Sequence, residues 1–457
     1  MRSVNPATGE AVGAIDSTPV GEIPAVVARA RAALPGWRAL GPEGRAERLR
    51  AAGRALADRA DALATLVCRE MGKPRREAAG EIRACVAGLG EELDQVVAAL
   101  APEVLDDGRT RTTVFRDPYG VCAVIAPWNF PVMMPHEMVV PALMAGNTVV
   151  LKPSELTPIA GGAWAEILME ALPPDVLQVI HGDEEQGRAL VQADVDLIAF
   201  TGSRDAGAAI LTAAGPTLKR VVLELGGKDP MVVLEDADVD AAARFAVRNA
   251  FRNAGQVCVS TERIYVAEPI APAFEARVAE LAAALKIGAG EEEDTDVGPM
   301  VHPRQKAHVV AQVKAALDAG ARLLHGDAAD LDSEGNFLRP LVLVDVDHDM
   351  ALMRDETFGP VVGLMRFRSD DEAVALANDT PFGLGATVFG AEAHAVDVAR
   401  RLDAGMVGVN RSVGGAPGAP WVGAKQSGYG FHSGVHGHRQ FAQVRTVSSP
   451  STGRGAA

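Results

Sequence analysis

One cysteine of this chain lies where a reactive thiol would be expected. Cys258 follows the segment 251–257 (Phe-Arg-Asn-Ala-Gly-Gln-Val), in which Gly255 supplies a stop for a helix predicted over 240–253. The β-branched and aromatic run 263–266 predicts a strand just beyond it. Cys258 is therefore expected on a short connection between two rigid elements, where a thiol is held in place but can be reached. A nucleophilic role also requires an ionised sulfur, and the ordinary cysteine pKa is about 8.5.

The other three cysteines have the surroundings of small buried hydrophobic residues: Cys68 and Cys85 in Ala- and Leu-rich helical segments, and Cys122 in an apolar strand. Four cysteines in 457 residues, with no Cys-x-x-Cys spacing, argue against a disulfide framework or a structural zinc site and fit a reducing compartment. No metal site is predicted, because the histidines at 432, 436 and 438 are expected in a solvated tail.

Two polar side chains follow apolar strand segments and have the chemistry to assist a thiol. Glu224 ends the run 220–225, and burial there would raise its pKa and make it a general base. An ion pair with Lys228 is the competing interpretation. Asn129 lies between two prolines in the segment 127–131, so its amide can donate to an oxyanion in a fixed direction. The alternative is a rigid turn around a buried Trp128.

Three further segments have residue types that suit a dinucleotide. In Lys152-Pro153-Ser154-Glu155, the lysine can bind a ribose hydroxyl or a phosphate, and the glutamate can accept from two ribose hydroxyls while repelling a 2′-phosphate. The segment 200–207 follows a strand and opens a helix, so its backbone N–H groups can face a pyrophosphate, although Gly-x-Gly-x-x-Gly is absent. The third segment, 356–360, could give Glu356 to a ribose and Phe358 to a nicotinamide face. Each segment alone also fits an ordinary turn.

The elements that would position these residues alternate between short apolar runs and helix-length segments. Strands are expected at 121–125, 148–151, 177–180, 197–200, 220–225 and 231–234, as in a parallel sheet with helical crossovers. Before them, helices are expected over 22–34, 43–70 and 75–100, with no assigned chemistry, as cover for one face of the sheet. After them, helices are expected over 269–287 and 303–320, mixed strand and helix over 340–367 and 386–410, and a loop over 413–420. The fold class is α/β.

Composition limits the class of function. The net charge of −16 and the lack of a basic stripe argue against a nucleic-acid surface. No stretch approaches the roughly 18 apolar residues of a membrane span, and the N-terminus has no apolar signal core. A soluble cytoplasmic protein is expected. The segment 441–448 alternates like an exposed edge strand that joins another subunit, and the last few residues are expected to be disordered.

Taken together, the six motif segments resemble the aldehyde dehydrogenase superfamily in order and approximate spacing, over nearly the whole chain. The resemblance implies a Rossmann-like cofactor domain (1–101 and 119–226), a catalytic domain (227–430) and a small β oligomerisation flap (102–118 and 436–450), in homodimers or homotetramers. It implies Cys258, Glu224 and Asn129 as catalytic residues. It assigns NAD, with NADP possible, to Pro127, Trp128, Lys152, Ser154, Glu155, Gly202, Ser203, Leu225, Glu356 and Phe358.

The resemblance also implies a mechanism. The Cys258 thiolate attacks the aldehyde, and the oxyanion is held by the Asn129 amide and the Cys258 N–H. Hydride passes to the nicotinamide, and Glu224 then activates water to hydrolyse the thioester. Members that transfer the acyl group to coenzyme A generally lack a carboxylate at this position, so Glu224 favours water and a free acid product.

The nearest branch by motif is that of the succinate-semialdehyde dehydrogenases, and two substrate-binding positions depart from it. Glu137 replaces that branch's arginine, and Gly415 replaces its serine. A carboxylate at 137 would repel an anionic aldehyde, which favours an aliphatic or amino-aldehyde over succinate semialdehyde. The alternative is that a neighbour such as His136 or an arginine neutralises Glu137, and Arg411-Ser412 could receive a carboxylate from another direction.

Two other classes of function are weaker. A non-catalytic structural or binding protein on the same fold would be expected to lose Cys258, Glu224 or Asn129, and none is lost. A cysteine hydrolase would need a histidine base, and His136 is the only histidine within the segments above.

Overall fold

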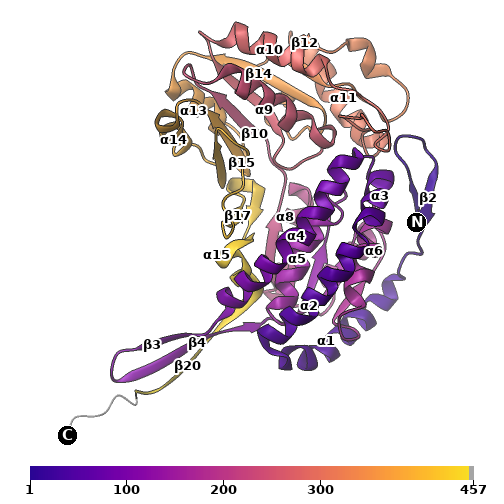
Figure 1. Cartoon of the computed structure of the whole chain (residues 1–457), viewed down its shortest axis with the longest axis vertical. Coiled ribbons are helices and arrows are strands. Elements are labelled where there is room, and N and C mark those ends of the chain that lie inside the picture. The colour runs from indigo at the N-terminus through magenta and orange to yellow at the C-terminus, as the bar shows by residue number, and fades with distance from the viewer. Residues whose placement is uncertain (452–457) are drawn as a thin grey trace.

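The computed structural model describes residues 1–451, in which two β-sheets flanked by helices form the two main bodies of the molecule (Figure 1). The first sheet has six strands in the order β18-β9-β8-β5-β6-β7. Its strands are β5 (Val121–Ile125), β6 (Thr148–Lys152), β7 (Leu177–Val179), β8 (Leu197–Thr201), β9 (Arg220–Glu224) and β18 (Gly428–Tyr429). The five earlier strands are parallel, as predicted, and their segments match the predicted runs within one or two residues.

Helices cover both faces of this sheet. On one face lie α5 (Met133–Met144) and α6 (Pro158–Met169), under an outer layer of α2 (Gly41–Asp58), α3 (Ala60–Met71) and α4 (Arg75–Leu100). On the other face lie α1 (Ile23–Ala39), α7 (Glu184–Gln192) and α8 (Arg204–Ala214). The prediction that the first helices cover one face is therefore wrong for α1, and the single helix expected over 43–70 is two helices. The chain leaves α3 through Gly72, whose φ of 88° favours glycine.

The second sheet has seven strands in the order β12-β13-β14-β11-β10-β15-β16. They are β10 (Asp229–Val233), β11 (Thr261–Ala267), β12 (Arg322–His325), β13 (Leu341–Val344), β14 (Val361–Phe367), β15 (Gly385–Phe389) and β16 (Met406–Val409). Its helices are α9 (Val239–Phe251), α10 (Ala271–Ala283), α11 (Pro303–Asp318), α12 (Ala351–Arg354), α13 (Asp370–Asn378) and α14 (Glu392–Ala399). The run 231–234, expected in the first sheet, belongs to this one. The helices predicted at 269–287 and 303–320 are confirmed as α10 and α11.

A third, three-stranded sheet extends away from both bodies (Figure 1). It pairs β3 (Glu103–Asp106) with β4 (Thr110–Pro118) and β4 with β20 (Ala442–Pro450), all antiparallel. The strand expected near 441–448 is therefore present, and β20 is a terminal strand of its sheet. The expectation for the last few residues falls on 452–457, outside the described part.

The C-terminal segment returns to the first sheet before it reaches β20. In the described residues, β18 pairs antiparallel with β9, although the range 227–430 was expected to belong to the other body. Nearby, β17 (Trp421–Val422) pairs with β19 (Phe431–His432), and α15 (Gly434–His438) packs against α4. The loop over 413–420 is confirmed, and a two-stranded hairpin of β1 (Arg2–Val4) and β2 (Ala11–Ala14) begins the chain. None of the described helices is long and apolar enough for a membrane span.

Candidate active site

A pocket of about 620 Å³ lies at the carboxyl ends of β5, β8 and β9. Residues from both main bodies line it. In open α/β sheets this edge is where ligands bind. The three predicted catalytic residues all line the pocket, together with most of the predicted cofactor-binding residues. The lining residues are Pro127, Trp128, Asn129, Met134, Thr201, Gly202, Ser203, Glu224, Leu225, Gly226, Cys258, Gln305, Glu356 and Phe358.

The backbone before Cys258 turns sharply into this pocket. Helix α9 ends at Phe251, two residues earlier than predicted, and Asn253, Ala254 and Gly255 follow with φ values of 50°, 54° and 71°. A left-handed conformation costs a non-glycine residue roughly 1 to 2 kcal/mol, so this turn is held under strain by its surroundings. At Gly255 a Cβ atom would lie 1.9 Å from the Gly359 carbonyl oxygen, which leaves room for glycine alone.

The thiol of Cys258 lines the pocket and is partly exposed. Burial, and then the nearby Glu224 carboxylate, raise the pKa of the Cys258 thiol well above its ordinary value. The site therefore favours the protonated thiol, although a nucleophilic role requires the thiolate. A neighbouring base can supply the thiolate by accepting the proton. Glu224 is the neighbouring carboxyl group in the pocket.

Glu224 has the environment predicted for a general base. It is buried at the end of β9, and burial raises the pKa of its carboxyl group. Its Oε1 accepts a hydrogen bond from Trp421 Nε1 at 3.4 Å, and its Oε2 has no hydrogen-bond partner among residues 1–451. The competing interpretation, a Glu224–Lys228 pair, is wrong, because Lys228 Nζ lies 2.6 Å from Glu262 Oε2.

Asn129 is fixed as an oxyanion donor requires. Its Nδ2 donates to the Gln256 carbonyl at 3.1 Å, which leaves its second N–H for another acceptor. Its own carbonyl accepts from Lys73 Nζ at 2.7 Å and from Asn253 Nδ2 at 3.2 Å. The adjacent Trp128 is partly exposed to the pocket rather than buried, so the alternative of a turn around a buried tryptophan does not apply.

The cofactor side of the pocket fits a dinucleotide. Ser203 caps α8 by accepting from the Ala206 N–H at 3.3 Å, so the first turn of the helix opens beside Gly202, as predicted. Across the pocket the rings of Trp128 and Phe358 meet edge to face with centroids 5.4 Å apart. A helix N-terminus suits a pyrophosphate, and an aromatic wall suits a nicotinamide ring.

Glu356 lines the same side of the pocket and is half-buried. Its Oε1 accepts from the Gly227 N–H at 3.0 Å. Burial, followed by the charge of Glu262, raises the pKa of Glu356 to about 8. Glu262 itself fixes the neighbouring backbone, because it accepts from the Thr357 and Phe358 N–H groups at 2.8 Å each.

Lys152, Ser154 and Glu155 do not line the pocket but lie at the end of β6, the next strand along the same edge. Lys152 and Ser154 are buried, which argues against a simple surface turn. Lys152 Nζ lies 3.6 Å from Glu155 Oε2, and the Glu155 side chain is 43% exposed. A ligand that extends from the pocket across β5 toward β6 would reach them.

The two predicted substrate residues also lie outside the pocket. Glu137, on α5, accepts from Ser433 Oγ at 2.9 Å and lies 3.7 Å from His432 Nδ1. Burial alone would raise the pKa of Glu137, but the combined interactions with His432, His136 and Ser433 outweigh burial and lower the pKa to about 2. The alternative of a neutralising neighbour is thus supported, with His432 ahead of His136, which contacts Glu92. Gly415 lies in the exposed loop.

The solvated-tail prediction is wrong for two of the three C-terminal histidines. His432 and His438 are 3% and 2% exposed, because β19 packs against β9 and α15 packs against α4. His432 stacks on Trp421, with centroids 6.2 Å apart. Within residues 1–451 no group of three or more His, Cys, Asp or Glu side chains could hold a metal ion.

Several charged residues behind the pocket were missed by the sequence reasoning. Lys73, Glu77 and Glu81 belong to the segment that was assigned no chemistry, yet they contact the loops that carry Asn129 and Asn253. The spacing of these charges could have indicated their role. Glu77 and Glu81 lie four positions apart, on one face of the helix, and Lys73 precedes them by another four.

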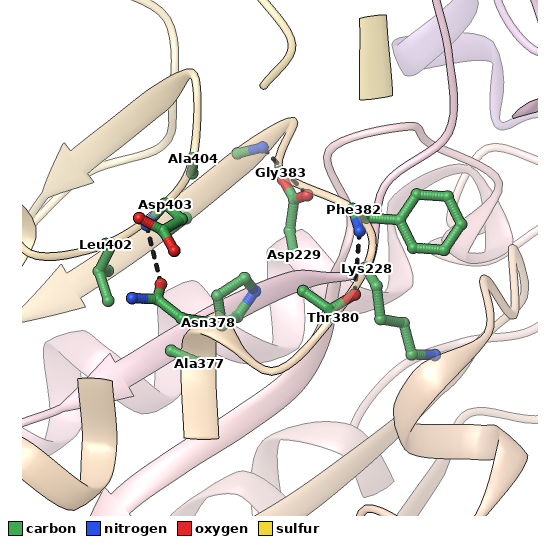
Figure 2. A pocket seen from close by; sticks show the side chains of 13 residues that line it. Lys228, Asp229, Ala377, Asn378, Thr380, Phe382, Gly383, Leu402, Asp403 and Ala404 are labelled. Atoms are coloured by element: carbon green, nitrogen blue, oxygen red, sulfur yellow. Dashed lines mark hydrogen bonds between the residues drawn. The ribbon is translucent and has the colours of Figure 1, made fainter. Parts of the chain in front are cut away.

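Figure 2 shows a second, smaller cavity of about 220 Å³ at the start of β10. Asp229 points toward the start of β15, where its Oδ1 accepts from the Gly385 N–H at 3.1 Å, and Lys228 extends away from it. Burial raises the pKa of Asp229 well above its ordinary value, and its hydrogen bond to the Gly385 N–H joins β10 to β15.

Comparisons with known proteins agree with the geometry. The family model described as "Aldehyde dehydrogenase family" matches residues 1–447. The chain is 36% identical to succinate-semialdehyde dehydrogenase [NADP(+)] GabD of Escherichia coli K12, over 96% of this chain and 92% of that protein. It is 36% identical to aminoaldehyde dehydrogenase 2 of Solanum lycopersicum, over 97% and 90%. The crystal structure of an E. coli NADP-dependent enzyme superposes with a TM-score of 0.95 at 34% identity, over 99% of this chain and 95% of that one. The chain therefore belongs to the aldehyde dehydrogenase family, whose enzymes oxidise aldehydes with NAD or NADP.

Proposed function

We propose that this protein oxidises an aldehyde to the free carboxylic acid with Cys258 as nucleophile, Glu224 as base and Asn129 as oxyanion donor. The observation that carries the proposal is that these three side chains line one pocket together with the elements that fit a dinucleotide. Cys258→Ala should abolish NADH formation with every aldehyde, and Glu224→Gln should leave a single-turnover burst with little steady-state turnover. Undiminished turnover in both variants would contradict the assignment.

The chemistry begins with a proton transfer, because burial and Glu224 raise the pKa of the Cys258 thiol. Glu224 accepts this proton, which its raised pKa favours, and the sulfur attacks the carbonyl carbon. The oxyanion that forms accepts hydrogen bonds from Asn129 Nδ2 and the Cys258 N–H. A bound NAD or NADP supplies the hydride acceptor against Phe358. Glu224 passes the cysteine proton to solvent and then removes a proton from water as the water attacks the thioester. The acid is released, and the leaving sulfur takes back a proton.

For the cofactor, the position of Glu155 supports NAD over NADP. Its carboxylate is partly solvated, beyond the end of β6, where it can accept from ribose hydroxyls and would repel a 2′-phosphate. Glu155→Ala should raise KM for NAD and lower KM for NADP. An unchanged ratio of the two KM values would remove Glu155 from cofactor selection.

For the substrate, two classes stand: a neutral or amino-aldehyde, and an aldehyde with a distal carboxylate, as in succinate semialdehyde. The first class rested on a free carboxylate at Glu137, and that carboxylate already accepts a hydrogen bond from Ser433 and lies 3.7 Å from His432 Nδ1. A groove of about 1,830 Å³ beside α9 favours the second class.

This groove has a cationic wall in a protein of net charge −16. Arg248, Arg252 and Arg411 line it and are exposed, and none of them forms an ion pair with a described residue. Arg252 also lies near the nucleophile, because it begins the turn that leads from α9 to Cys258. Unpaired guanidinium groups suit a carboxylate, so we propose the semialdehyde class as the better supported.

The test compares kcat/KM for succinate semialdehyde, propanal and 4-aminobutanal in the wild type, in Arg252→Gln and in the matched surface control Arg59→Gln. The diacid semialdehyde should be preferred, and Arg252→Gln should raise its KM by about tenfold while the KM for propanal stays unchanged. Preference for 4-aminobutanal or propanal in the wild type would instead support the class first predicted from Glu137.

We further propose that the first sheet with its helices (1–101 and 119–226) binds the dinucleotide, that 227–430 carries the nucleophile, and that 102–118 with 436–450 is an oligomerisation flap. The support is the terminal position of β20 and the exposure of Val444 and Val447 on it. We expect a cytoplasmic homodimer or homotetramer. Sedimentation of the wild type and of a Val444→Lys/Val447→Lys variant measures this, and a wild-type monomer would contradict it.

A further inference from the structure

A buried ion pair lies directly behind the loop that carries Asn129. Lys73 Nζ is 2.7 Å from Glu81 Oε2, and the two side chains are 1% and 0% exposed. Lys73 follows Gly72, where α3 ends, and Glu81 lies on α4. Taking two charges out of water is costly unless each is well paired, so a pair this deep requires good geometry on both sides. The other hydrogen bonds of Lys73 and Glu81 show which backbone groups this ion pair holds in place.

Both members of the pair bind the backbone around Asn129. Lys73 Nζ donates to the Asn129 carbonyl at 2.7 Å, and its ammonium lies 3.9 Å from the centroid of the Phe130 ring. Glu81 Oε1 accepts from the Val132 and Met133 N–H groups at 2.9 and 3.0 Å, at the start of α5. The segment from Asn129 to Met133 is therefore held at both ends. The Lys73 ammonium binds the carbonyl of its first residue, and the Glu81 carboxylate binds the N–H groups where α5 begins, which also suits the positive end of the α5 dipole.

The same stretch of chain holds the other loop of the site. Glu77, one turn before Glu81 on α4, accepts from the Asn253 N–H at 2.9 Å, within the strained turn that precedes Cys258. Asn253 in turn donates through Nδ2 to the Asn129 carbonyl at 3.2 Å, so this oxygen receives both Lys73 and Asn253. The segment 73–81 thus contacts the oxyanion loop from the first sheet and the nucleophile loop that follows α9.

We infer that Lys73 and Glu81 are positioning residues for the reaction of this site. They set the distance between the Asn129 amide and the Cys258 sulfur without touching the substrate. The inference rests on the proposed roles of Cys258 and Asn129. A misplacement of about 1 Å in such a constellation lowers a rate by about a hundredfold, so the loss of the Lys73 contact should appear in the acylation step.

The test uses an activated ester, because its hydrolysis needs the nucleophile and the oxyanion donor but no hydride transfer. With p-nitrophenyl acetate, the Cys258 sulfur bonds to the acetyl carbon, p-nitrophenolate leaves, and water then hydrolyses the acetyl thioester. Lys73→Met leaves Glu81 unpaired and can unfold the protein, so the decisive variant is the double change Lys73→Met/Glu81→Gln, which leaves no buried unpaired charge. Arg45→Met is the matched control: Arg45 is buried and donates to the Met144 carbonyl at 2.9 Å, at the far end of α5.

We expect the double variant to fold with a melting temperature near that of Arg45→Met and to lose between about tenfold and a hundredfold in kcat for ester hydrolysis, with KM unchanged. Alkylation of Cys258 by iodoacetamide should keep its wild-type rate, since this reaction needs no oxyanion donor. Ester hydrolysis at the wild-type kcat in the folded double variant would overturn the inference, as would an equal loss in Arg45→Met. Failure of the proposed function is separate: a wild type that hydrolyses the ester but forms no NADH with any aldehyde would contradict the dehydrogenase assignment and leave the Lys73 comparison valid.

Discussion

The carboxyl group of Glu356 should make the stability of the ligand-free protein depend on pH. Its pKa is raised from 4.5 to about 8 by burial and by Glu262, which at about 1.4 kcal/mol per pKa unit sets an upper limit of about 5 kcal/mol. Because the folded state holds the proton more tightly than the unfolded state, this stabilisation is complete below pH 4.5 and is lost as the pH rises through 8. Between pH 6 and pH 8 the loss should be about 2 kcal/mol, since the pocket admits some water.

Glu356→Gln removes this titration and leaves a side chain of the same shape that can still accept from the Gly227 N–H. Urea unfolding at pH 6 and pH 8 measures the effect as the difference in free energy of unfolding, wild type against variant. The wild type should lose about 2 kcal/mol more than the variant over this interval. Equal pH dependence in the two proteins would refute both the burial argument and the raised pKa.

Three other predictions concern the site. In Gly255→Ala the added methyl group would lie 1.9 Å from the Gly359 carbonyl oxygen, so either the nucleophile loop or the Phe358 loop must move. We expect kcat to fall by at least about tenfold, as measured by stopped-flow NADH formation. The rate of Cys258 alkylation in the wild type should rise steadily above pH 8, because burial and Glu224 raise the thiol pKa, and a plateau below pH 7 would show a thiolate at rest. Glu137, with a pKa lowered to about 2, gives stability that is complete above pH 4.5 and lost as the pH falls toward 2; Glu137→Gln should therefore reduce the change in melting temperature between pH 5 and pH 3, as measured by calorimetry.

The pattern of apolar residues along the chain correctly predicted the strands of the first sheet. The strands β5, β8 and β9 are short apolar runs between helix-length segments, and their positions matched because burial on both faces leaves that signature. The family's motif segments likewise placed Cys258, Glu224 and Asn129 in one pocket. The assignment of 231–234 to the first sheet was wrong. The sequence of a buried parallel strand does not show to which of two successive sheets the strand belongs.

Contacts between distant segments were beyond the sequence reasoning. The pairing of Glu137 with His432 joins residues 295 positions apart, and their approach depends on the C-terminal segment folding back onto α4. Lys73 and Glu81 looked like ordinary helix surface, because their burial is created by α5 and the Asn129 loop. The raised pKa of Cys258 likewise could not be predicted from the sequence, because it depends on how deeply neighbouring residues bury the thiol.

The pairing of β18 with β9 has a consequence for synthesis of the chain. The strand that ends in Glu224 receives its last neighbour, Gly428–Tyr429, late in synthesis, and its carboxyl group accepts from Trp421, which lies 197 positions further along the chain. A nascent chain can therefore carry the sulfur long before the base acquires its final partners. The complete site therefore forms only after the segment from Trp421 to Tyr429 has folded onto β9.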